Sequence, residues 1–377
     1  MVGTRPIPTW ESDSHAHPRL NTERMTTRPD PAHLLRAGAA RTVITPPVGH
    51  AIHGPEHEPF RSVGVRDDLL ARALVLSTGD ESAVVITLDV WGLAPALVQS
   101  ICEQTARAVK CDPRLVWVSC SGNATGPNLW ARDEEYVRYS AYLPELCAGA
   151  AASAFQAMGP AGIGGAVARV PGVSTNVAGR GHDADQAVAV VSVIGENDRP
   201  IARVVSFACP ASVSSADGAW TADWPGYAAW ALDQSAGGIT LFSRGADGDI
   251  RPFDWWSGNP SPTHAERLVS DVQALGLLIA TQAAQAAARA QMKRNVTIGW
   301  GADPAAGLRA LRVGDAVFIS SESPQPSTLT SRLRGSLARA TVIMSANIRG
   351  DPFGPPPGLD ESFLSAASGV ARSAGAG

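Results

Sequence analysis

The chain has 377 residues, of which 45% are hydrophobic and 18% charged, with a formal net charge of −4. This composition is typical of a folded globular protein, and the lack of any Lys/Arg run argues against a nucleic acid partner. Five cysteines without a CxxC pair indicate a reducing compartment rather than a disulfide framework. No segment reaches the ~18 apolar residues of a transmembrane helix, and no signal-peptide core opens the chain. We therefore expect a cytoplasmic protein without a transmembrane segment.

The predicted elements alternate between strands and helices. Residues 1–36 are polar and Pro-rich, which predicts a flexible tail, and no linker or repeat divides residues 37–377, which predicts one domain. Apolar, β-branched segments predict strands at 41–45, 69–76, 82–89, 115–119, 187–193, 202–208, 239–242, 296–299, 308–312, 316–320 and 341–345. Helical spacing predicts helices at 94–110, 134–158, 225–234, 263–290 and 327–338, followed by a last helix near the end of the chain. The pattern predicts an α/β fold with a mixed β-sheet core flanked by helices.

The segment at residues 115–127 carries the most specific signal. It reads Leu-Val-Trp-Val-Ser-Cys-Ser-Gly-Asn-Ala-Thr-Gly-Pro, a short apolar strand followed by a turn of small residues. It resembles the segment of the neutral/alkaline (non-lysosomal) ceramidases in which a strand runs into Thr-His-Thr-His-Ser-Gly-Pro. The resemblance implies that Gly122 and Ala124 stand where the family has two zinc-site histidines. Neither side chain can bind a metal.

Four further motifs follow the order of the ceramidase pattern between about residues 38 and 352. They are Ile44-Thr45-Pro46-Pro47, the run from Gly64 to Leu74, Ala222-Asp223-Trp224-Pro225-Gly226, and Gly245-Ala246-Asp247-Gly248-Asp249-Ile250-Arg251-Pro252. The resemblance identifies a divergent member of this family and implies its catalytic-domain fold. We expect no counterpart of the C-terminal immunoglobulin-like domain of the long ceramidases.

The same resemblance implies that the remaining catalytic positions have changed as well. Cys209 stands at a further histidine position, either as a soft metal ligand or as a small buried residue, and Arg251 stands at the nucleophilic serine. Glu322 matches the zinc-binding glutamate, and the segment with the tyrosine ligand leads here into Asp351. The sequence therefore predicts loss of zinc amidase chemistry and no cofactor.

An acid without its metal needs another form of compensation. Either the pKa of Glu322 rises, or Arg251 supplies the missing positive charge; the alternative is a surface arginine in an eroded loop. We expect Asp249, Glu322 and Asp351 to be the candidate acids and Arg251 the electrostatic element.

Tryptophans and an acid in the same segments predict an apolar pocket, although some of them are equally well explained as core residues or helix caps. The candidate substrate-binding residues are Trp91, Trp130, Asp223, Trp224, Trp255 and Trp256. They favour an enzyme that isomerises or cyclises a lipid- or terpenoid-like molecule by metal-free acid/base chemistry.

Two alternatives remain open at this point. One is a non-catalytic ligand-binding pseudoenzyme. The other is a residual N-acyl amide hydrolase with a relocated metal on His50, His53 and His57, helped by Glu56 or Asp351. The oligomeric state does not follow from the sequence.

Overall fold

The first sheet is built around the predicted hairpin of β5 (Leu70–Thr78) and β6 (Glu81–Leu88). In the computed structural model it has the order β10-β1-β5-β6-β8, with β1 (Leu35–Val43), β8 (Val116–Cys120) and β10 (Gly159–Pro160). β8 joins β6 in parallel and is the last strand of the sheet. The structure describes residues 34–52, 60–79, 81–129, 134–176, 184–213, 218–252, 262–322, 325–337, 341–345 and 361–374.

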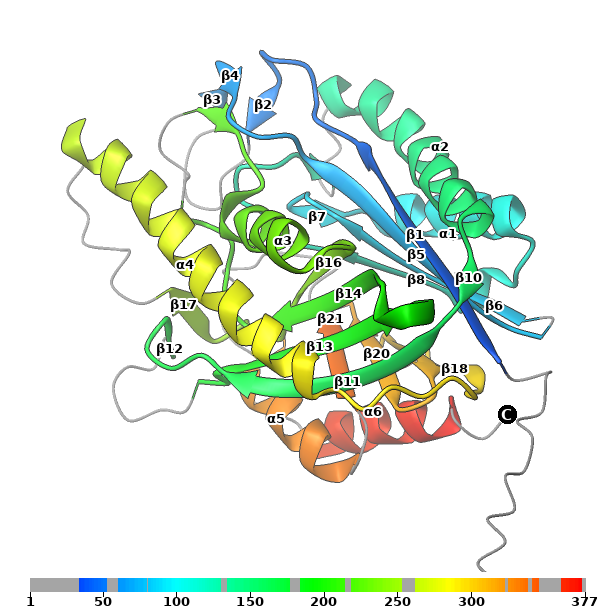
Figure 1. The fold of residues 1–377 in the computed structure, drawn as a ribbon. Helices are drawn as coiled ribbons and strands as arrows, with labels where there is room; N and C mark the ends of the chain where they lie inside the picture. Colours follow the sequence, from blue (N-terminus) through cyan, green and yellow to red (C-terminus); the bar gives the residue numbers. More distant parts are fainter. Residues whose placement is uncertain are drawn as a thin grey trace, which may run out of the picture.

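Helices α1 (Pro95–Val109) and α2 (Glu134–Gln156) cover the outer face of this first sheet (Figure 1). Apolar side chains of both helices and of β5, β6 and β8 form one buried cluster between them. Helix α1 ends at Lys110, whose left-handed backbone (φ 59°) lets its N–H donate to the Ala106 carbonyl.

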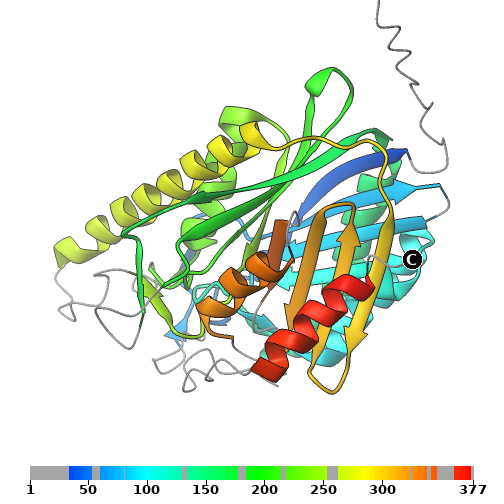
Figure 2. The ribbon, with the colours of Figure 1, turned by 90° about the horizontal axis from the view of Figure 1, so that it is seen from below.

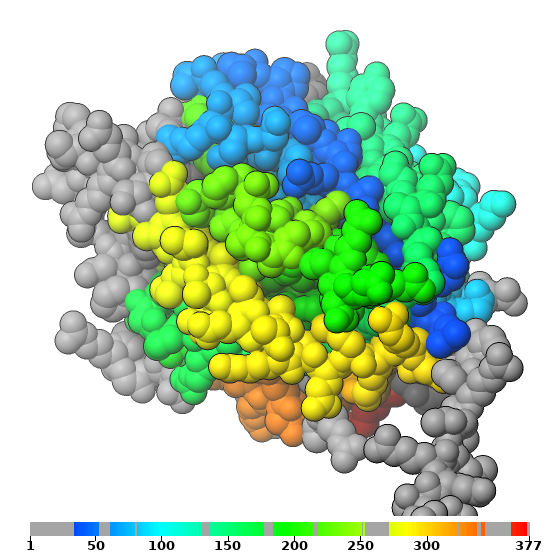
Figure 3. Space-filling view, in the orientation of Figure 1, coloured from blue at the N-terminus to red at the C-terminus, as the bar shows by residue number. Residues whose placement is uncertain are grey.

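The second sheet has the order β11-β13-β14-β16 and carries α3 and α4 on its outer face. Figure 3 shows α3 and α4 exposed on this side of the molecule. The elements are β11 (Gly162–Arg169), β13 (Ala187–Ile194), β14 (Pro200–Phe207), β16 (Ile239–Arg244), α3 (Asp223–Ala236) and α4 (Pro262–Arg289).

The third sheet has the order β18-β19-β20-β21, and α5 and α6 pack against it (Figure 2). Its elements are β18 (Ile298–Asp303), β19 (Leu308–Val313), β20 (Ala316–Ser321), β21 (Thr341–Ser345), α5 (Ser327–Ser336) and α6 (Glu361–Ser373). The short strands are β2 (Ala51–Ile52), β3 (Phe60–Arg61), β4 (Gly64–Val65), β7 (Gly92–Leu93), β9 (Asn128–Leu129), β12 (Ser174–Asn176), β15 (Ala219–Trp220) and β17 (Ile250–Pro252).

One apolar core joins the three sheets. It includes Leu76, Val85, Val191, Leu241 and Phe318, one or two residues from each sheet. Ser119 on β8 and Ser243 on β16 share a buried hydrogen bond of 2.9 Å, so the ends of these strands meet although they belong to different sheets. The candidate functional positions lie close to this junction between the ends of β8 and β16.

The predicted α/β class and mixed sheet core are confirmed. Two strand predictions need correction. β1 begins at Leu35, earlier than the predicted strand at 41–45, so its first residues lie inside the predicted tail. β11 was not predicted, because three glycines (Gly162, Gly164 and Gly165) give it low strand propensity. A Cβ at Gly164 or Gly165 would overlap the Gln291 carbonyl or the Thr341 side chain, so close packing requires these glycines.

Candidate functional site

Three strand ends meet in a small region that we call the strand-end site, defined by Gly122, Ala124, Cys209, Arg244 and Asp247. Gly122 and Ala124 follow β8, Cys209 follows β14, and Arg244 ends β16. The Ala124 N–H donates to the Ala211 carbonyl at 2.9 Å, which ties the β8 turn to the segment after β14. The structure therefore brings together the three positions at which the sequence predicted replaced zinc ligands.

Arg244 occupies the space beside Gly122. A Cβ placed on Gly122 would lie 2.8 Å from Arg244 Nη1 and closer still to Cδ, and Gly122 has a left-handed backbone with φ +68°. A histidine side chain at this position would therefore overlap the arginine and would also strain the backbone. The small residue after β8 and the large residue at the end of β16 are complementary in volume.

The positive charge of Arg244 is balanced at short range. Its Nε donates to both carboxylate oxygens of Asp247, at 2.8 and 2.7 Å, and both side chains are almost fully buried. Burial lowers the pKa of Arg244, but the charge and hydrogen bonds of Asp247 outweigh it, so the pKa stays raised. The strand-end site thus holds a buried guanidinium in place of open space. The sequence predicted a compensating arginine for Glu322 at Arg251; the buried arginine of the strand-end site is Arg244, and its partner is Asp247.

The rest of the β8 turn is closed by its own hydrogen bonds. Asn123 Nδ2 and Thr125 Oγ1 both donate to the Thr221 carbonyl, at 2.6 and 2.9 Å, and the Thr125 N–H donates to Asn123 Oδ1 at 3.1 Å. Both side chains are buried. Asn123, Thr125 and the Thr221 carbonyl thus satisfy one another and hold the turn closed, whereas the buried Ser121 Oγ has no hydrogen-bond partner among the described residues.

Cys209 is fully buried behind the same turn. Burial raises the pKa of its thiol well above the ordinary value, and the nearby Asp247 and Asp223 carboxylates act in the same direction. A metal ligand must be the thiolate. Of the two interpretations of Cys209 offered by the sequence, these surroundings favour the small buried residue.

Asp249 makes contacts typical of a helix-capping acid. It accepts hydrogen bonds from Asn176 Nδ2 at 2.8 Å and from the Ser327 N–H at 2.7 Å, the latter at the first residue of α5. A carboxylate at a helix N-terminus satisfies a free N–H and interacts favourably with the helix dipole. Arg251 lies on β17, opposite Thr175 of β12.

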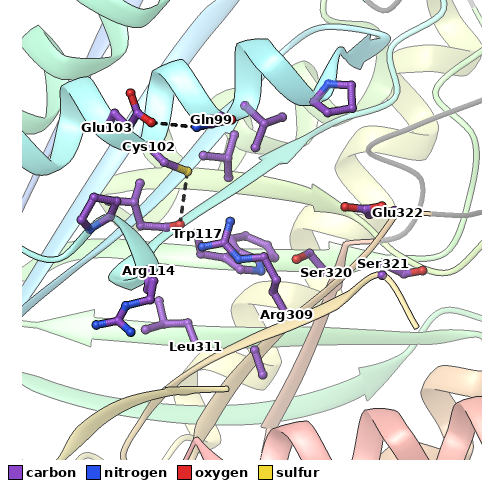
Figure 4. Close-up of a pocket in the computed structure, with 17 residues that line it drawn as sticks. Gln99, Cys102, Glu103, Arg114, Trp117, Arg309, Leu311, Ser320, Ser321 and Glu322 are labelled. Atoms are coloured by element: carbon purple, nitrogen blue, oxygen red, sulfur yellow. Dashed lines mark hydrogen bonds between the residues drawn. The ribbon is translucent and has the colours of Figure 1, made fainter. Parts of the chain in front are cut away.

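Glu322 lies apart from these buried acids. It is an exposed residue at the end of β20, on the rim of a cavity of about 430 Å³ that we call the α1 cavity (Figure 4). The cavity lies between β8, the last strand of the first sheet, and strands β19 and β20 of the third sheet. Helix α1 forms its third wall. Its apolar walls include Val98, Trp117 and Leu311, and its cations are Arg114 and Arg309. The expectation of a buried, uncompensated Glu322 is not met.

Of the tryptophans predicted to line the pocket, the structure describes Trp91 and Trp224. Trp224 is fully buried between Phe207 and Phe242, with ring centroids 6.2 and 4.9 Å away, and its Nε1 donates to the Pro210 carbonyl at 3.1 Å. It is a core residue. Trp91 is also buried.

Asp223 opens α3 and is buried. Its backbone is left-handed, with φ +53°, and its side chain accepts the Trp224 N–H at 2.6 Å. Its contacts are therefore those of a helix-start residue, one of the two interpretations offered by the sequence. The other predicted positions, Trp130, Trp255, Trp256, Asp351, His53, His57 and Glu56, lie outside the described residues.

The strand-end site does not suit a zinc ion. Gly122 and Ala124 carry no donor atom, Cys209 is held as a thiol, and a buried guanidinium fills the space between them. Across the described part of the chain, no group of three His, Cys, Asp or Glu residues is arranged to hold a metal ion. Nor does any described helix have the length and apolar character needed to cross a membrane.

Comparison with known proteins identifies the class of fold. The solved structure of the neutral ceramidase from Pseudomonas aeruginosa matches with a TM-score of 0.69 and 12% identity, over 90% of this chain and 75% of that chain. A ceramidase complexed with C2 matches with a TM-score of 0.63, the same identity and the same coverage. No family model matches the sequence, and no curated protein does. The chain therefore has the neutral ceramidase fold at an identity that defines fold alone.

Sequence reasoning did not identify Arg244, Asp247, Trp117 or Arg309 as functional positions. A partial signal for Arg244 existed, because the resemblance implies histidines where this chain has Gly122 and Ala124, and such a replacement leaves a volume that another side chain must fill. The linear sequence does not say which side chain fills it. Trp117 belongs to the strand of the 115–127 motif but not to its implied metal positions, and Arg309 lies in an ordinary strand pattern without a motif.

Proposed function

We propose that this protein is a ceramidase-fold binding protein for a hydrophobic small molecule and that it lacks zinc amidase activity. The observation that carries the proposal is the Arg244 side chain packed against Gly122. A zinc ion there would face a guanidinium at short range, without histidine donors to hold it. The resemblance to ceramidases then explains the fold and the apolar character of the ligand, but not an amide-cleaving reaction.

The surroundings of the acids support a binding role over catalysis. Asp247 is paired with Arg244, and Asp249 caps α5. An acid committed to structural hydrogen bonds in the ground state is poorly placed to transfer a proton to a substrate. Neither acid lines the α1 cavity.

The experiment that tests the proposal measures metal content and amidase activity together. Protein purified without chelator and without a polyhistidine tag should hold far less than one zinc per chain, before and after incubation with zinc. It should leave a fluorescent N-acyl amide uncleaved under the same conditions. About one tightly held zinc per chain together with metal-dependent cleavage would overturn the proposal.

A second candidate is the metal-free acid/base enzyme that isomerises or cyclises an apolar substrate. The observation that favours it is the placement of Glu322 on the rim of a cavity with apolar walls. A Glu322→Gln variant separates the two roles. In the enzyme, turnover falls by about 100-fold or more while ligand affinity is kept; in the binding protein there is no turnover to lose.

A further inference from the structure

The α1 cavity contains a cation without an acidic partner. Arg309 on β19 lines the cavity and forms no ion pair with any described residue. Arg309 forms a side-chain hydrogen bond with the Cys102 thiol, but burial raises the pKa of that thiol, so Cys102 does not offer a negative charge. A guanidinium has five N–H donors in a fork that matches a carboxylate. Arg309 therefore has unused donor capacity at a concave surface.

Trp117 provides a second donor in the same cavity. Its side chain is 4% exposed, and its Nε1 has no hydrogen-bond partner. Leaving a buried N–H unsatisfied costs about 1–3 kcal/mol, which native proteins rarely tolerate without a reason. Phe318 packs against the indole, with ring centroids 5.4 Å apart, and helps to hold the ring. Nε1 itself has less than 1 Å² of accessible surface, so a ligand that accepts this hydrogen bond must displace the atoms that cover it, and it then recovers the lost interaction.

The remaining charges of the cavity restrict the ligand further. Arg114 is engaged by Asp112 at 2.5 Å, and its guanidinium stacks over Trp300 at 4.4 Å. Glu103 and Glu322 place two carboxylates on the lining. One available cation between two acids suits a ligand with a single negative charge, and a dianion such as a phosphate monoester meets more repulsion.

The walls and the volume define the rest of the ligand. Val98, Val116, Val118 and Leu311 line the cavity with apolar surface. Its volume of about 430 Å³ lies within the range of roughly 300–1,000 Å³ usual for small-molecule sites. A ligand that buries an apolar body and presents one anionic end satisfies both the walls and the two donors.

We propose that the α1 cavity binds a small amphipathic monocarboxylate, with the carboxylate on the Arg309 guanidinium and the Trp117 indole N–H. Figure 4 shows both side chains in the part of the cavity between α1 and β20. This inference rests on the proposed binding role and adds the chemical class of the ligand and the residues that recognise it. It does not depend on the strand-end site.

Calorimetric titration with 4-phenylbutanoate tests the proposal, with 4-phenylbutanamide and 4-phenylbutyl phosphate as matched probes. The carboxylate should bind, and the affinities of the neutral amide and of the phosphate should each be lower by a factor of about ten or more. Arg309→Gln should weaken carboxylate binding by about tenfold or more, and Trp117→Phe by about threefold or more, since it removes only the N–H. Arg312→Gln is the control, because Arg312 lies on the same strand but does not line the cavity.

Several outcomes would overturn the assignment. They are no carboxylate binding up to about 10 mM, equal binding of acid and amide, tighter binding of the phosphate, or unchanged affinity in Arg309→Gln. Thermal unfolding of each variant checks that it is folded, and Arg309→Lys, which keeps the charge but not the fork, should fall between wild type and Arg309→Gln. Absence of carboxylate binding in a protein that also holds no zinc would defeat this inference alone. Zinc binding with amide cleavage would defeat the proposed function instead.

Discussion

The strand-end site and the α1 cavity share one strand and differ in almost every physical property. The C-terminal end of β8 leads into the strand-end site, where Arg244 and Asp247 satisfy each other in a filled interior. The middle of β8 carries Trp117 into the α1 cavity, where an indole N–H and the Arg309 guanidinium have no acidic partner among the described residues. The charges of the strand-end site satisfy each other, whereas the donors of the α1 cavity can still gain hydrogen bonds from a ligand. This difference moves the expected functional region from the strand-end site to the α1 cavity.

The largest expected effect concerns the ion pair itself. Asp247→Ala leaves the Arg244 guanidinium buried without its counter-charge, so we expect the free energy of unfolding to fall by about 3–5 kcal/mol. Denaturant-induced unfolding measures this change. The double variant Arg244→Met/Asp247→Leu removes both charges and should recover most of the loss.

The matched control for this prediction is a pair on the surface. Lys293 and Asp315 lie 2.5 Å apart, but their side chains are 54% and 40% exposed. Asp315→Ala should therefore change stability by less than about 1 kcal/mol. Equal losses in the two aspartate variants would show that the strand-end pair is not the buried, closed feature described above.

A smaller effect tests how tightly Arg244 packs against the β8 turn. Gly122 and Gly172 both have left-handed backbones, with φ +68° and +79°, but a Cβ at Gly172 meets nothing within 4 Å. Gly172→Ala should cost about 1 kcal/mol from backbone strain alone, and Gly122→Ala about 2–4 kcal/mol because the clash adds to it. Chemical denaturation of both variants provides the comparison. If the two costs are the same, the space beside Gly122 is open enough to accept a side chain.

Asp249 distinguishes a structural acid from a catalytic one. Asp249→Asn keeps the size of the side chain but weakens the hydrogen bond to the Ser327 N–H, so we expect a loss of about 1–2 kcal/mol in unfolding free energy. Ligand binding in the α1 cavity should be unaffected. If Asp249→Asn has wild-type stability but altered ligand affinity, Asp249 has a functional role rather than a structural one.

The smallest effect appears at alkaline pH. Burial raises the pKa of the Cys111 thiol to about 11, above its value in the unfolded chain. The folded state therefore prefers the neutral thiol. The resulting contribution to stability is complete below about pH 9 and is lost as the pH rises through about 11. Unfolding free energies measured from pH 8 to 11 should fall less steeply in Cys111→Ser; an unchanged slope would assign the alkaline loss to other groups.

Much of the fold could be predicted from periodicity. The hairpin of β5 and β6 and the helices α1, α2 and α4 lie within a few residues of the predicted ranges. Their signals are local, because apolar spacing and β-branched content are properties of a short segment. β11 was not predicted for the opposite reason: Gly164 and Gly165 are required by close contacts with Gln291 and Thr341, which lie far along the chain.

The candidate site was predictable only in part. The motif order placed Gly122, Ala124 and Cys209 at related positions, and the structure brings the three together at adjoining strand ends. The sequence predicted Arg251 as the compensating cation for Glu322; its backbone lies on β17, and the buried guanidinium of the strand-end site belongs to Arg244, which pairs with Asp247. Which cation meets which carboxylate depends on the segments that the fold brings together.

By itself, the sequence determined the α/β class and the order of most elements, because each is a property of neighbouring residues; the replacement of metal-binding side chains after β8 stays a prediction from the resemblance. Only the tertiary structure decided that Arg244 packs against Gly122, that Trp224 belongs to the core, and that Trp117 and Arg309 share a cavity. The physical reason is that volume, burial and charge pairing are set by segments from different sheets, and their meeting is not encoded in any local pattern.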